Sequence, residues 1–188
     1  MSDRSFSPYL ASVRAKEVVS RLEGGPVIGA EVGVHRGDMS AALMRLHPRL
    51  WLYMVDAWTE GVYTDDKDGL AGRTEAEALE DKAVASRQTE FAAGRRLILH
   101  GRSQDAAEDL RGDRVRLDFV FLDADHSREA LERDIGAWVP LIRPGGLLGG
   151  HDYGDPRFAV TQVVGEAAEA NGWTVELGEN RTWFVRLP

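Results

Sequence analysis

The sequence predicts an α/β fold, in which a mostly parallel, doubly wound β-sheet is covered by helices on both faces and ends in an antiparallel hairpin. Three observations predict it. Short apolar segments alternate five times with longer segments of helical character along the 188 residues, as strands do with crossover helices. Most of these apolar segments lack polar alternation, as strands buried on both faces do. The last two segments are joined too tightly for a crossover, so they must be antiparallel.

Short apolar runs bounded by turn residues mark the strands. Five of them alternate with helices, and a proline and two glycines at 144–146 turn the chain into the fifth. Two further runs close the chain and are joined by a tight turn at Glu179 and Asn180. We expect strands at 27–33, 50–56, 96–101, 117–123, 146–152, 173–178 and 181–187.

Capping residues and helical spacing mark the helices. Thr74 and Glu77 have the spacing of a capping box at a helix start, and Ser103 is placed to cap the helix that follows it. Asp155 and Pro156 suit the cap and the first position of the last helix. We expect helices at about 10–22, 37–47, 74–91, 103–111, 127–142 and 155–171.

Length and composition indicate one domain, 1–188, in the cytoplasm. A chain of 188 residues suits one core better than two. Within it we distinguish an N-terminal helical segment at 1–24 and a long polar loop at 57–73, a candidate lid because such loops tend to be functional. The N-terminus lacks the apolar core of a signal peptide, and no apolar run has membrane-spanning length. We therefore expect no membrane partner.

Charge and cysteine content exclude several classes of protein. Asp and Glu outnumber Lys and Arg by 31 to 23, which gives a net charge of −8. A nucleic-acid partner is therefore not expected, because binding one usually requires a basic surface. The absence of cysteine excludes disulfides, thiolate metal sites and cysteine nucleophiles.

The first candidate site follows the first strand, because ligands of open α/β sheets bind beyond the carboxyl ends of the strands. The segment EVGVHRG at 31–37 contains glycines that let a ligand approach the backbone, and the next helix offers free N–H groups. A tight turn alone explains the glycines equally well. The dinucleotide pattern G-x-G-x-x-G is absent, which disfavours a nicotinamide cofactor.

Polar residues also follow the next two strands. Asp56 ends the second strand, where a carboxylate can accept both hydroxyls of a ribose. Acidic residues at such ends are mostly solvated, but the neighbouring glycine turn favours the ribose interpretation. After the third strand, GRSQ at 101–104 combines a flexible turn with a helix cap, and capping alone is compatible with a ligand role.

Carboxylates and histidines follow the fourth and fifth strands. The segment DADH at 123–126 ends one apolar run, and His151 and Asp152 end the other. Neighbouring strand ends lie about 5 Å apart, so these side chains can converge. Oxygen and imidazole ligands suit magnesium, manganese and similar divalent ions. A hydrogen-bonded His–Asp pair without metal is an equal alternative.

At these positions the chain resembles class I S-adenosylmethionine-dependent methyltransferases. EVGVHRG is similar to their E-x-G-x-x-x-G motif, and RPGG before a strand is similar to the entry of their fifth strand. GRSQD, LDFVFLD, DADHS and GGHDY resemble segments of cation-dependent, catechol-type O-methyltransferases and of small bacterial methyltransferases. The resemblance covers about 26–153 and implies a Rossmann-like sheet of strand order 3-2-1-4-5-7-6.

The resemblance implies a cofactor site for S-adenosylmethionine. In it the glycines line the methionine part, Asp56 holds the ribose, and the polar pair at 103–104 lies beside the adenine. Glu31 orients the glycine turn. The full cofactor-binding set comprises Glu31, Gly33, His35, Gly37, Asp56, Ala57, Ser103, Gln104 and Asp123.

The resemblance also implies a metal and a general base. Asp123, His151 and Asp152 match the ligands of a divalent cation, Mg²⁺ or Mn²⁺. His126 matches the general base and forms the catalytic pair with Asp123. The chain departs from the family at two of these positions, since the family usually has a carboxylate at 151 and a lysine at 126.

The leading hypothesis is methyl transfer to a hydroxyl of a small molecule, for which the protein aligns the nucleophile and removes its proton. The expected partner is that small molecule, and a homodimer is allowed. The alternatives are a nicotinamide-dependent oxidoreductase and a non-catalytic cofactor-binding module. Trp58 and Tyr63 either cover an aromatic or sugar acceptor or are packing residues.

Overall fold

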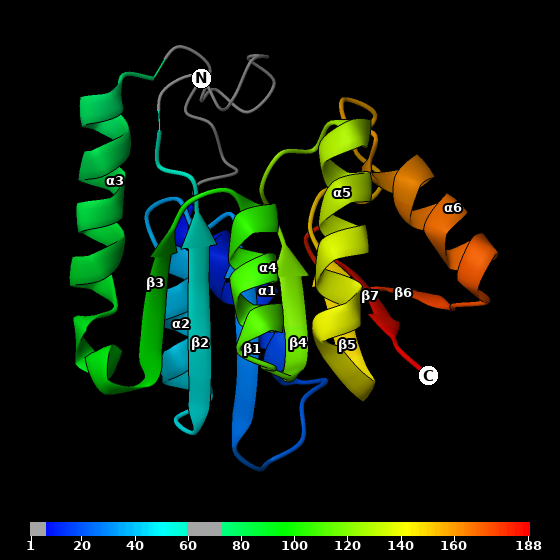
Figure 1. Ribbon diagram of the computed structural model, residues 1–188, viewed down its shortest axis with the longest axis horizontal. Coiled ribbons are helices and arrows are strands. Elements are labelled where there is room, and N and C mark those ends of the chain that lie inside the picture. The colour runs from blue at the N-terminus through cyan, green and yellow to red at the C-terminus, as the bar shows by residue number, and fades with distance from the viewer. Residues whose placement is uncertain (1–6, 60–72) are drawn as a thin grey trace.

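The computed structural model describes residues 7–59 and 73–188 and has a seven-stranded sheet between two layers of helices (Figure 1). The strand order is β3-β2-β1-β4-β5-β7-β6, which confirms the predicted order and fold class. The strands are β1 (Val27–Val32), β2 (Leu50–Asp56), β3 (Arg96–His100), β4 (Leu117–Leu122), β5 (Ile142–Gly150), β6 (Val175–Leu177) and β7 (Trp183–Arg186).

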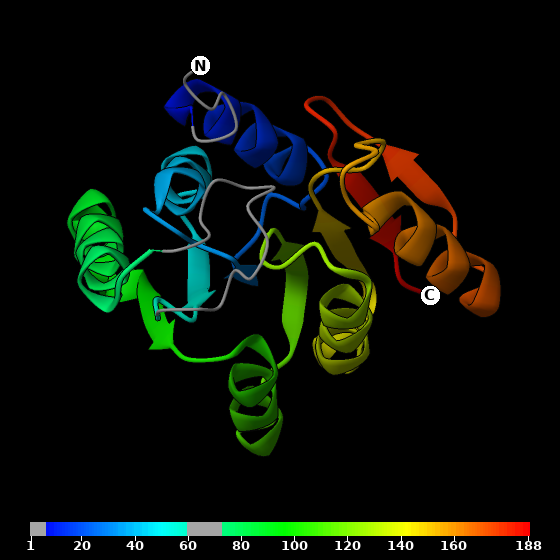
Figure 2. The same ribbon diagram turned by 90° about the horizontal axis from the view of Figure 1, so that it is seen from above.

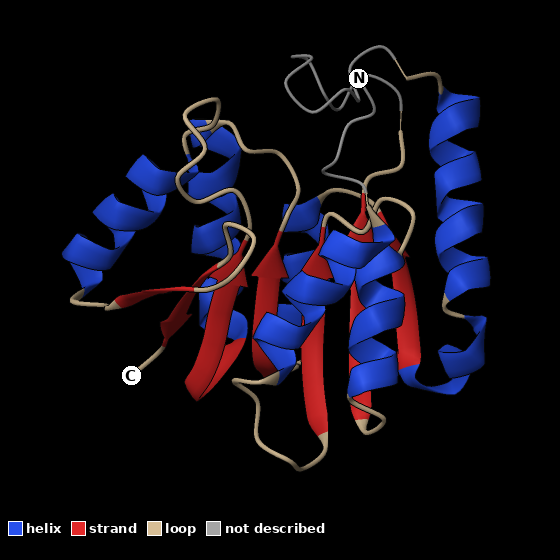
Figure 3. Cartoon of the chain, turned by 180° about the vertical axis from the view of Figure 1, so that it is seen from behind, coloured by secondary structure: helices blue, strands red, loops and turns tan. Residues whose placement is uncertain are grey.

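The register of the parallel strands aligns their carboxyl ends. Val32 at the end of β1 pairs with Val55 of β2 and with Leu122 of β4. Leu122 in turn pairs with Gly150, the last residue of β5. The loops that follow these strands therefore emerge at one edge of the sheet (Figure 3). Strand β7 runs antiparallel to both β5 and β6, as the short terminal turn predicts.

The helices divide between the two faces of the sheet (Figure 2). Helices α1, α2 and α3 share an apolar core with one face, and α4, α5 and α6 share a second core with the other. Trp138 is fully buried in the second core. The helices are α1 (Pro8–Val19), α2 (Asp38–Leu46), α3 (Glu75–Gln88), α4 (Ser103–Gly112), α5 (Arg128–Trp138) and α6 (Val160–Asn171), with 3-10 turns η3 (Glu90–Arg95) and η4 (Val139–Leu141).

Strand β5 begins at Ile142, earlier than the predicted start at residue 146. The register between β4 and β5 shifts after Leu117, so the segment predicted as a turn is an irregular part of the strand. Gly145 has a φ of 74°, a left-handed conformation that favours glycine. The predicted turn is therefore present in the backbone conformation of Gly145, but it lies within β5 and not before it.

The predicted helix caps have mixed outcomes. The capping box of Thr74 and Glu77 is present at the start of α3. The prediction that Ser103 caps α4 is wrong, because the cap position is Arg102. The Ser103 hydroxyl instead accepts a hydrogen bond from Nε1 of Trp138 at 2.8 Å. Its tertiary partner on α5 thus replaces the local one.

The predicted start of the last helix at Asp155 is also wrong. Helix α6 begins at Val160, with Ala159 at the cap position. The Asp155 carboxylate is buried and accepts hydrogen bonds from Arg157 and Arg181. Its Oδ1 also accepts the backbone N–H of Arg157 at 3.0 Å, so the carboxylate caps a turn that ends before α6 begins.

Two predicted segments reach beyond the described residues. Most of the candidate lid at 57–73, including Tyr63, lies outside them, as does the start of the N-terminal segment at 1–24. Within the described ranges, Trp58 is 4% exposed and belongs to the first core. No helix of these ranges is long and apolar enough to cross a membrane.

Truncating the core of α2 should destabilise the protein. Leu43 is completely buried between α2 and the sheet, whereas Leu46 on the same helix is 42% exposed. We expect Leu43→Ala to lower the free energy of unfolding by about 2–5 kcal/mol through lost burial and a residual cavity. Leu46→Ala is the matched control and should change it by about 0.5 kcal/mol or less. Urea denaturation measures both, and equal effects would contradict the packing.

Candidate functional site

The turn after β1 is shaped by close backbone contact with the end of β4. Gly33 has a φ of 94°, and a Cβ atom at this position would collide with the backbone carbonyl of Asp123. Gly37 has a φ of 79°, and its Cβ atom would lie 2.9 Å from Cα of Ala85. Both glycines are therefore required by space as well as by conformation.

Asp56 fixes this turn relative to the end of β2. One oxygen of its carboxylate accepts a hydrogen bond from the backbone N–H of His35 at 2.7 Å, and the other accepts one from the N–H of Trp58 at 2.9 Å. The indole of Trp58 donates back to the carbonyl of His35 at 2.8 Å. Burial raises the pKa of the Asp56 carboxyl. Asp56 thus ties the two strand ends together.

A second carboxylate holds the same turn from the side of α3. Asp81 is 3% exposed. Its oxygens lie 3.3 Å from Nε2 of His35, 3.6 Å from Nη1 of Arg36 and 2.5 Å from Nη2 of Arg73. Burial lowers the pKa of His35 despite these carboxylates. The sequence analysis missed Asp81, because no local pattern distinguishes it from a solvated acidic residue on a helix.

A cavity of about 540 Å³ opens at the carboxyl ends of β1, β2 and β3. Five residues of the predicted cofactor set line it: Gly33, Asp56, Ala57, Ser103 and Gln104. Residues that were not in that set also line it, among them Thr59, Gly101, Arg102, Ala124, Asp125, Arg133 and Asp134. The cavity therefore joins the strand ends at which a cofactor was predicted.

Asp134 is the buried polar residue of this cavity that sequence reasoning missed. It is 3% exposed and accepts a hydrogen bond from Nε2 of Gln104 at 2.6 Å. Burial raises the pKa of Asp134 to about 6, although Ser103 and Gln104 oppose this shift. The sequence gives no signal for Asp134, because a charged residue on a helix is normally solvated and its burial is seen only in the structure.

Glu31 lies beneath the glycine turn and does not line the cavity. It is 2% exposed, and its carboxyl accepts a hydrogen bond from the Ser40 hydroxyl at 2.5 Å. Burial raises the pKa of Glu31 to about 8. The side chain connects β1 to the first turn of α2, and its role in orienting the glycine turn stays a prediction.

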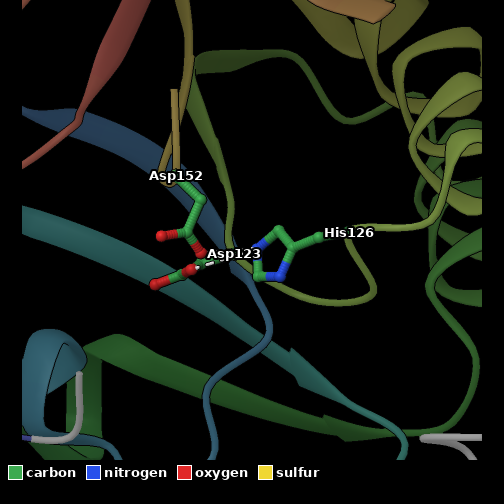
Figure 4. A group of neighbouring side chains, drawn as sticks. All are labelled: Asp123, His126 and Asp152. Atoms are coloured by element: carbon green, nitrogen blue, oxygen red, sulfur yellow. Dashed lines mark ion pairs between the residues drawn. The ribbon is translucent and has the colours of Figure 1, made fainter. Parts of the chain in front are cut away.

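A second group of polar side chains lies beside the cavity, at the ends of β4 and β5 (Figure 4). One nitrogen, Nε2 of His126, lies 3.5 Å from Oδ1 of Asp123 and 3.4 Å from Oδ2 of Asp152. His151 reaches the same two carboxylates through Nδ1, at 3.4 Å and 3.2 Å. The structure thus brings together all four residues predicted for the metal and the base.

This group has the composition and spacing of a cation site. Single ligand atoms of Asp123, His126 and Asp152 lie within 4.8 Å of one another. The prediction made His151 a metal ligand and His126 the base. In the structure, His126 joins Asp123 and Asp152 in the candidate ligand group, and both imidazoles face the carboxylates. Asp152 has a φ of 61°, a left-handed conformation that is uncommon outside glycine but that aspartate adopts more readily than most residues. Two carboxylates and an imidazole suit a divalent ion with mixed oxygen and nitrogen ligands.

Protein cations balance the negative charges of this group. Burial disfavours a charged imidazole, but the carboxylates of Asp123 and Asp152 outweigh it and raise the pKa of His151 to about 9. Burial would likewise raise the pKa of Asp123, yet His151 and Arg14 hold it well below its ordinary value. Arg14 approaches from α1, with its Nε 3.7 Å from Oδ2 of Asp123.

The sequence matches a family described as a methyltransferase domain over residues 30–153. This range contains both the cavity and the charged group. No curated protein sequence matches the chain.

Solved structures with the same fold share little sequence with the chain. CalS11, a calicheamicin methyltransferase, has a TM-score of 0.65 at 15% identity, with 93% of this chain and 77% of that one covered. An O-methyltransferase from Bacillus cereus in complex with SAH has a TM-score of 0.63 at 16% identity, covering 97% and 82%. The MycE methyltransferase, in complex with Mg and SAH, has a TM-score of 0.56 at 20% identity, with 98% of this chain covering 49% of that one.

The buried carboxyl of Glu31 predicts a pH-dependent stability. Its pKa rises from 4.5 to about 8 on folding, so stability from the neutral carboxyl is complete below pH 4.5 and is lost as the pH rises towards 8. Glu31→Gln cannot ionise. Between pH 5 and pH 8, wild type should therefore lose about 1 kcal/mol or more of unfolding free energy relative to this variant.

Urea denaturation at several pH values measures this difference. Glu108→Gln, at an exposed position of α4, is the control and should follow the wild-type pH dependence. Parallel curves for wild type and Glu31→Gln would show that Glu31 does not stay neutral in the fold.

Proposed function

The chain belongs to the methyltransferase domain family, and from this premise we propose that it transfers a methyl group from S-adenosylmethionine to a hydroxyl of a small molecule. The observation that carries the proposal is the contact between Gly33 and the backbone of Asp123. Gly33 lines the cavity, and the side chain of Asp123 belongs to the charged group. The cavity proposed for the cofactor and the charged group proposed for the transfer therefore adjoin each other at Gly33 and Asp123.

The cavity suits the adenosine part of the cofactor. Asp56 lies at its wall with both oxygens already bound to backbone N–H groups, and each carboxylate oxygen has a further lone pair for a ribose hydroxyl. Ser103 and Gln104 stand at the start of α4, where polar atoms can recognise an adenine. With adenosine placed in this way, the sulfonium extends past Gly33 towards Asp123.

The charged group suits the transfer itself. In the proposed step, the acceptor oxygen forms a bond to the methyl carbon while the bond from that carbon to sulfur breaks, and its electron pair stays on sulfur. The hydroxyl proton must leave, and the imidazole of His126 beside Asp123 is placed to accept it. His151 is less suited to this role, because the raised pKa keeps its imidazole protonated at neutral pH.

The residues also fit a divalent cation, which we include in the proposal. Asp123 and Asp152 would each supply an oxygen, and His126 or His151 a nitrogen. When bound, a divalent cation lowers the pKa of a coordinated hydroxyl and orients it. If His126 is a ligand, then the proton must pass to another acceptor. Nitrogen ligands favour manganese, iron, cobalt, nickel or zinc over magnesium.

A small-molecule acceptor is part of the same proposal. CalS11 is a calicheamicin methyltransferase and MycE a methyltransferase of the mycinamycin biosynthetic pathway, and both have this fold. The net charge of −8 does not favour a polyanionic acceptor. The nicotinamide alternative is not favoured, since the family match concerns methyltransferases.

Removing the carboxylate of Asp56 should weaken cofactor binding. We expect Asp56→Ala to weaken binding of S-adenosylhomocysteine by about 1.5–3 kcal/mol, the usual contribution of hydrogen bonds to a charged group. NAD should not bind to wild type. Isothermal titration calorimetry measures both, and Asp113→Ala, at an exposed position beyond α4, is the control. Equal affinity of wild type and Asp56→Ala would refute the ribose assignment.

Methyl transfer should depend on a divalent cation. Methylation of a pool of small hydroxyl compounds is measured by mass spectrometry. We expect exhaustive EDTA treatment to abolish this turnover and the addition of single metals to restore it. Asp152→Ala should prevent restoration, whereas the exposed Asp109→Ala should permit it. Recovery should fail in acid, because a protonated imidazole cannot coordinate. Full activity of the metal-free enzyme would contradict the metal site and favour a transfer in which a histidine alone accepts the proton.

A further inference from the structure

Arg14 is a buried cation whose hydrogen-bond donors are unused. It lies on α1 and is 8% exposed. A guanidinium carries five N–H donors, yet no hydrogen bond from Arg14 is found within the described part of the chain, and its Nε is fully buried without a partner there. Its ion-pair distance to Asp123 is 3.7 Å, too long for a hydrogen bond. Leaving such a group unsatisfied costs free energy.

The carboxylate of Asp123 separates Arg14 from the histidines. Its Oδ1 faces His126 and His151, whereas its Oδ2 faces Arg14. Helix α1 packs against α2 on one face of the sheet (Figure 2), and α2 begins directly after Gly37. The guanidinium therefore approaches the oxygen of Asp123 that does not face the histidines.

The chemistry of this pair selects a zwitterion. A lone anion at Arg14 would also meet the negative charge of Asp123, and a lone cation at Asp123 would meet Arg14. An α-amino acid head group carries a carboxylate and an ammonium on one carbon, and so offers each residue its opposite charge. The unused donors of Arg14 match the carboxylate, for which a guanidinium is the preferred partner. The Oδ2 atom of Asp123, which lies 3.7 Å from Nε of Arg14 and makes no hydrogen bond to it, matches the ammonium.

We propose that Arg14 binds the α-carboxylate of the methionine part of S-adenosylmethionine, while Oδ2 of Asp123 accepts from its α-ammonium. The inference rests on the proposed function and adds α1 to the cofactor site. Arg14 lies before the range that matches the family, residues 30–153, so the family match does not assign it. Binding of the head group satisfies the buried guanidinium and anchors the end of the cofactor opposite the adenine.

Two ligands that differ in the head group test the proposal. S-adenosylhomocysteine carries the amino acid, whereas 5′-methylthioadenosine has the same thioether nucleoside without it. Calorimetry is done with wild type, Arg14→Gln and Arg14→Lys. We expect Arg14→Gln to weaken S-adenosylhomocysteine about tenfold or more and to change 5′-methylthioadenosine less than twofold. Arg14→Lys, which keeps the charge but not the fork of donors, should lie between.

The controls separate binding from folding. Lys16→Gln removes an exposed cation from the same helix and should change neither affinity, and thermal melting checks that each variant folds. An equal loss for both ligands would make Arg14 a structural residue and overturn the inference, as would an unchanged affinity for S-adenosylhomocysteine. If wild type binds neither ligand, then the proposed function itself fails. If wild type binds both and Arg14→Gln weakens neither selectively, only the role of Arg14 fails.

Discussion

The backbone contact between Gly33 and Asp123 is the constraint on which the site depends. Strands β1 and β4 are neighbours, and the N–H of Asp123 continues their ladder by donating to the carbonyl of Val32 at 2.8 Å. Only a residue without Cβ can turn at position 33 while the Asp123 carbonyl stays in place. The close approach leaves the cavity on the side of β2 and β3 and the charged group on the side of β5. The strand order 3-2-1-4-5 is therefore what makes the two adjoin, since ligand sites form where that order reverses.

The charges around this contact are arranged so that each buried carboxylate has a compensating neighbour or stays neutral. Asp123 is paired with His151 and Arg14, and Asp152 with His151 and His126. Glu31 has no cation within ion-pair distance among residues 7–59 and 73–188, and burial raises its pKa to about 8. Buried charges persist only when they are paired. A positively charged sulfonium arriving beside Asp123 would thus meet an ionised carboxylate, while the buried Glu31 contributes no net charge.

Sequence patterns predicted the fold closely where local chemistry decides it. The apolar run at 50–56 is a strand with those bounds, and the capping box at Thr74 is present. Predictions failed where a distant residue supplies the partner. Ser103 bonds to Trp138 on α5, and Asp155 bonds to Arg181 beyond β6, and neither lies at the cap position of the helix that follows it. Such pairs, separated by 35 and 26 positions, leave no trace in a local pattern.

The same distinction holds for the site. Residues at strand ends could be predicted because the topology brings those ends together, and Asp56, Gln104, Asp123 and Asp152 are all found there. Helices contribute the residues that were missed, Arg14 from α1, Asp81 from α3 and Asp134 from α5. A charged residue on a helix is normally solvated, and only its burial against the strand ends, 8% exposed or less in each case, identifies it. The conformational strain points the same way. Six described residues other than glycine have a positive φ, and three of them, His35, Trp58 and Asp152, lie within three residues of the end of a strand of the site. Asp56 holds two of them through their backbone N–H groups, so one carboxylate both stabilises the strained turns and forms the wall of the cavity.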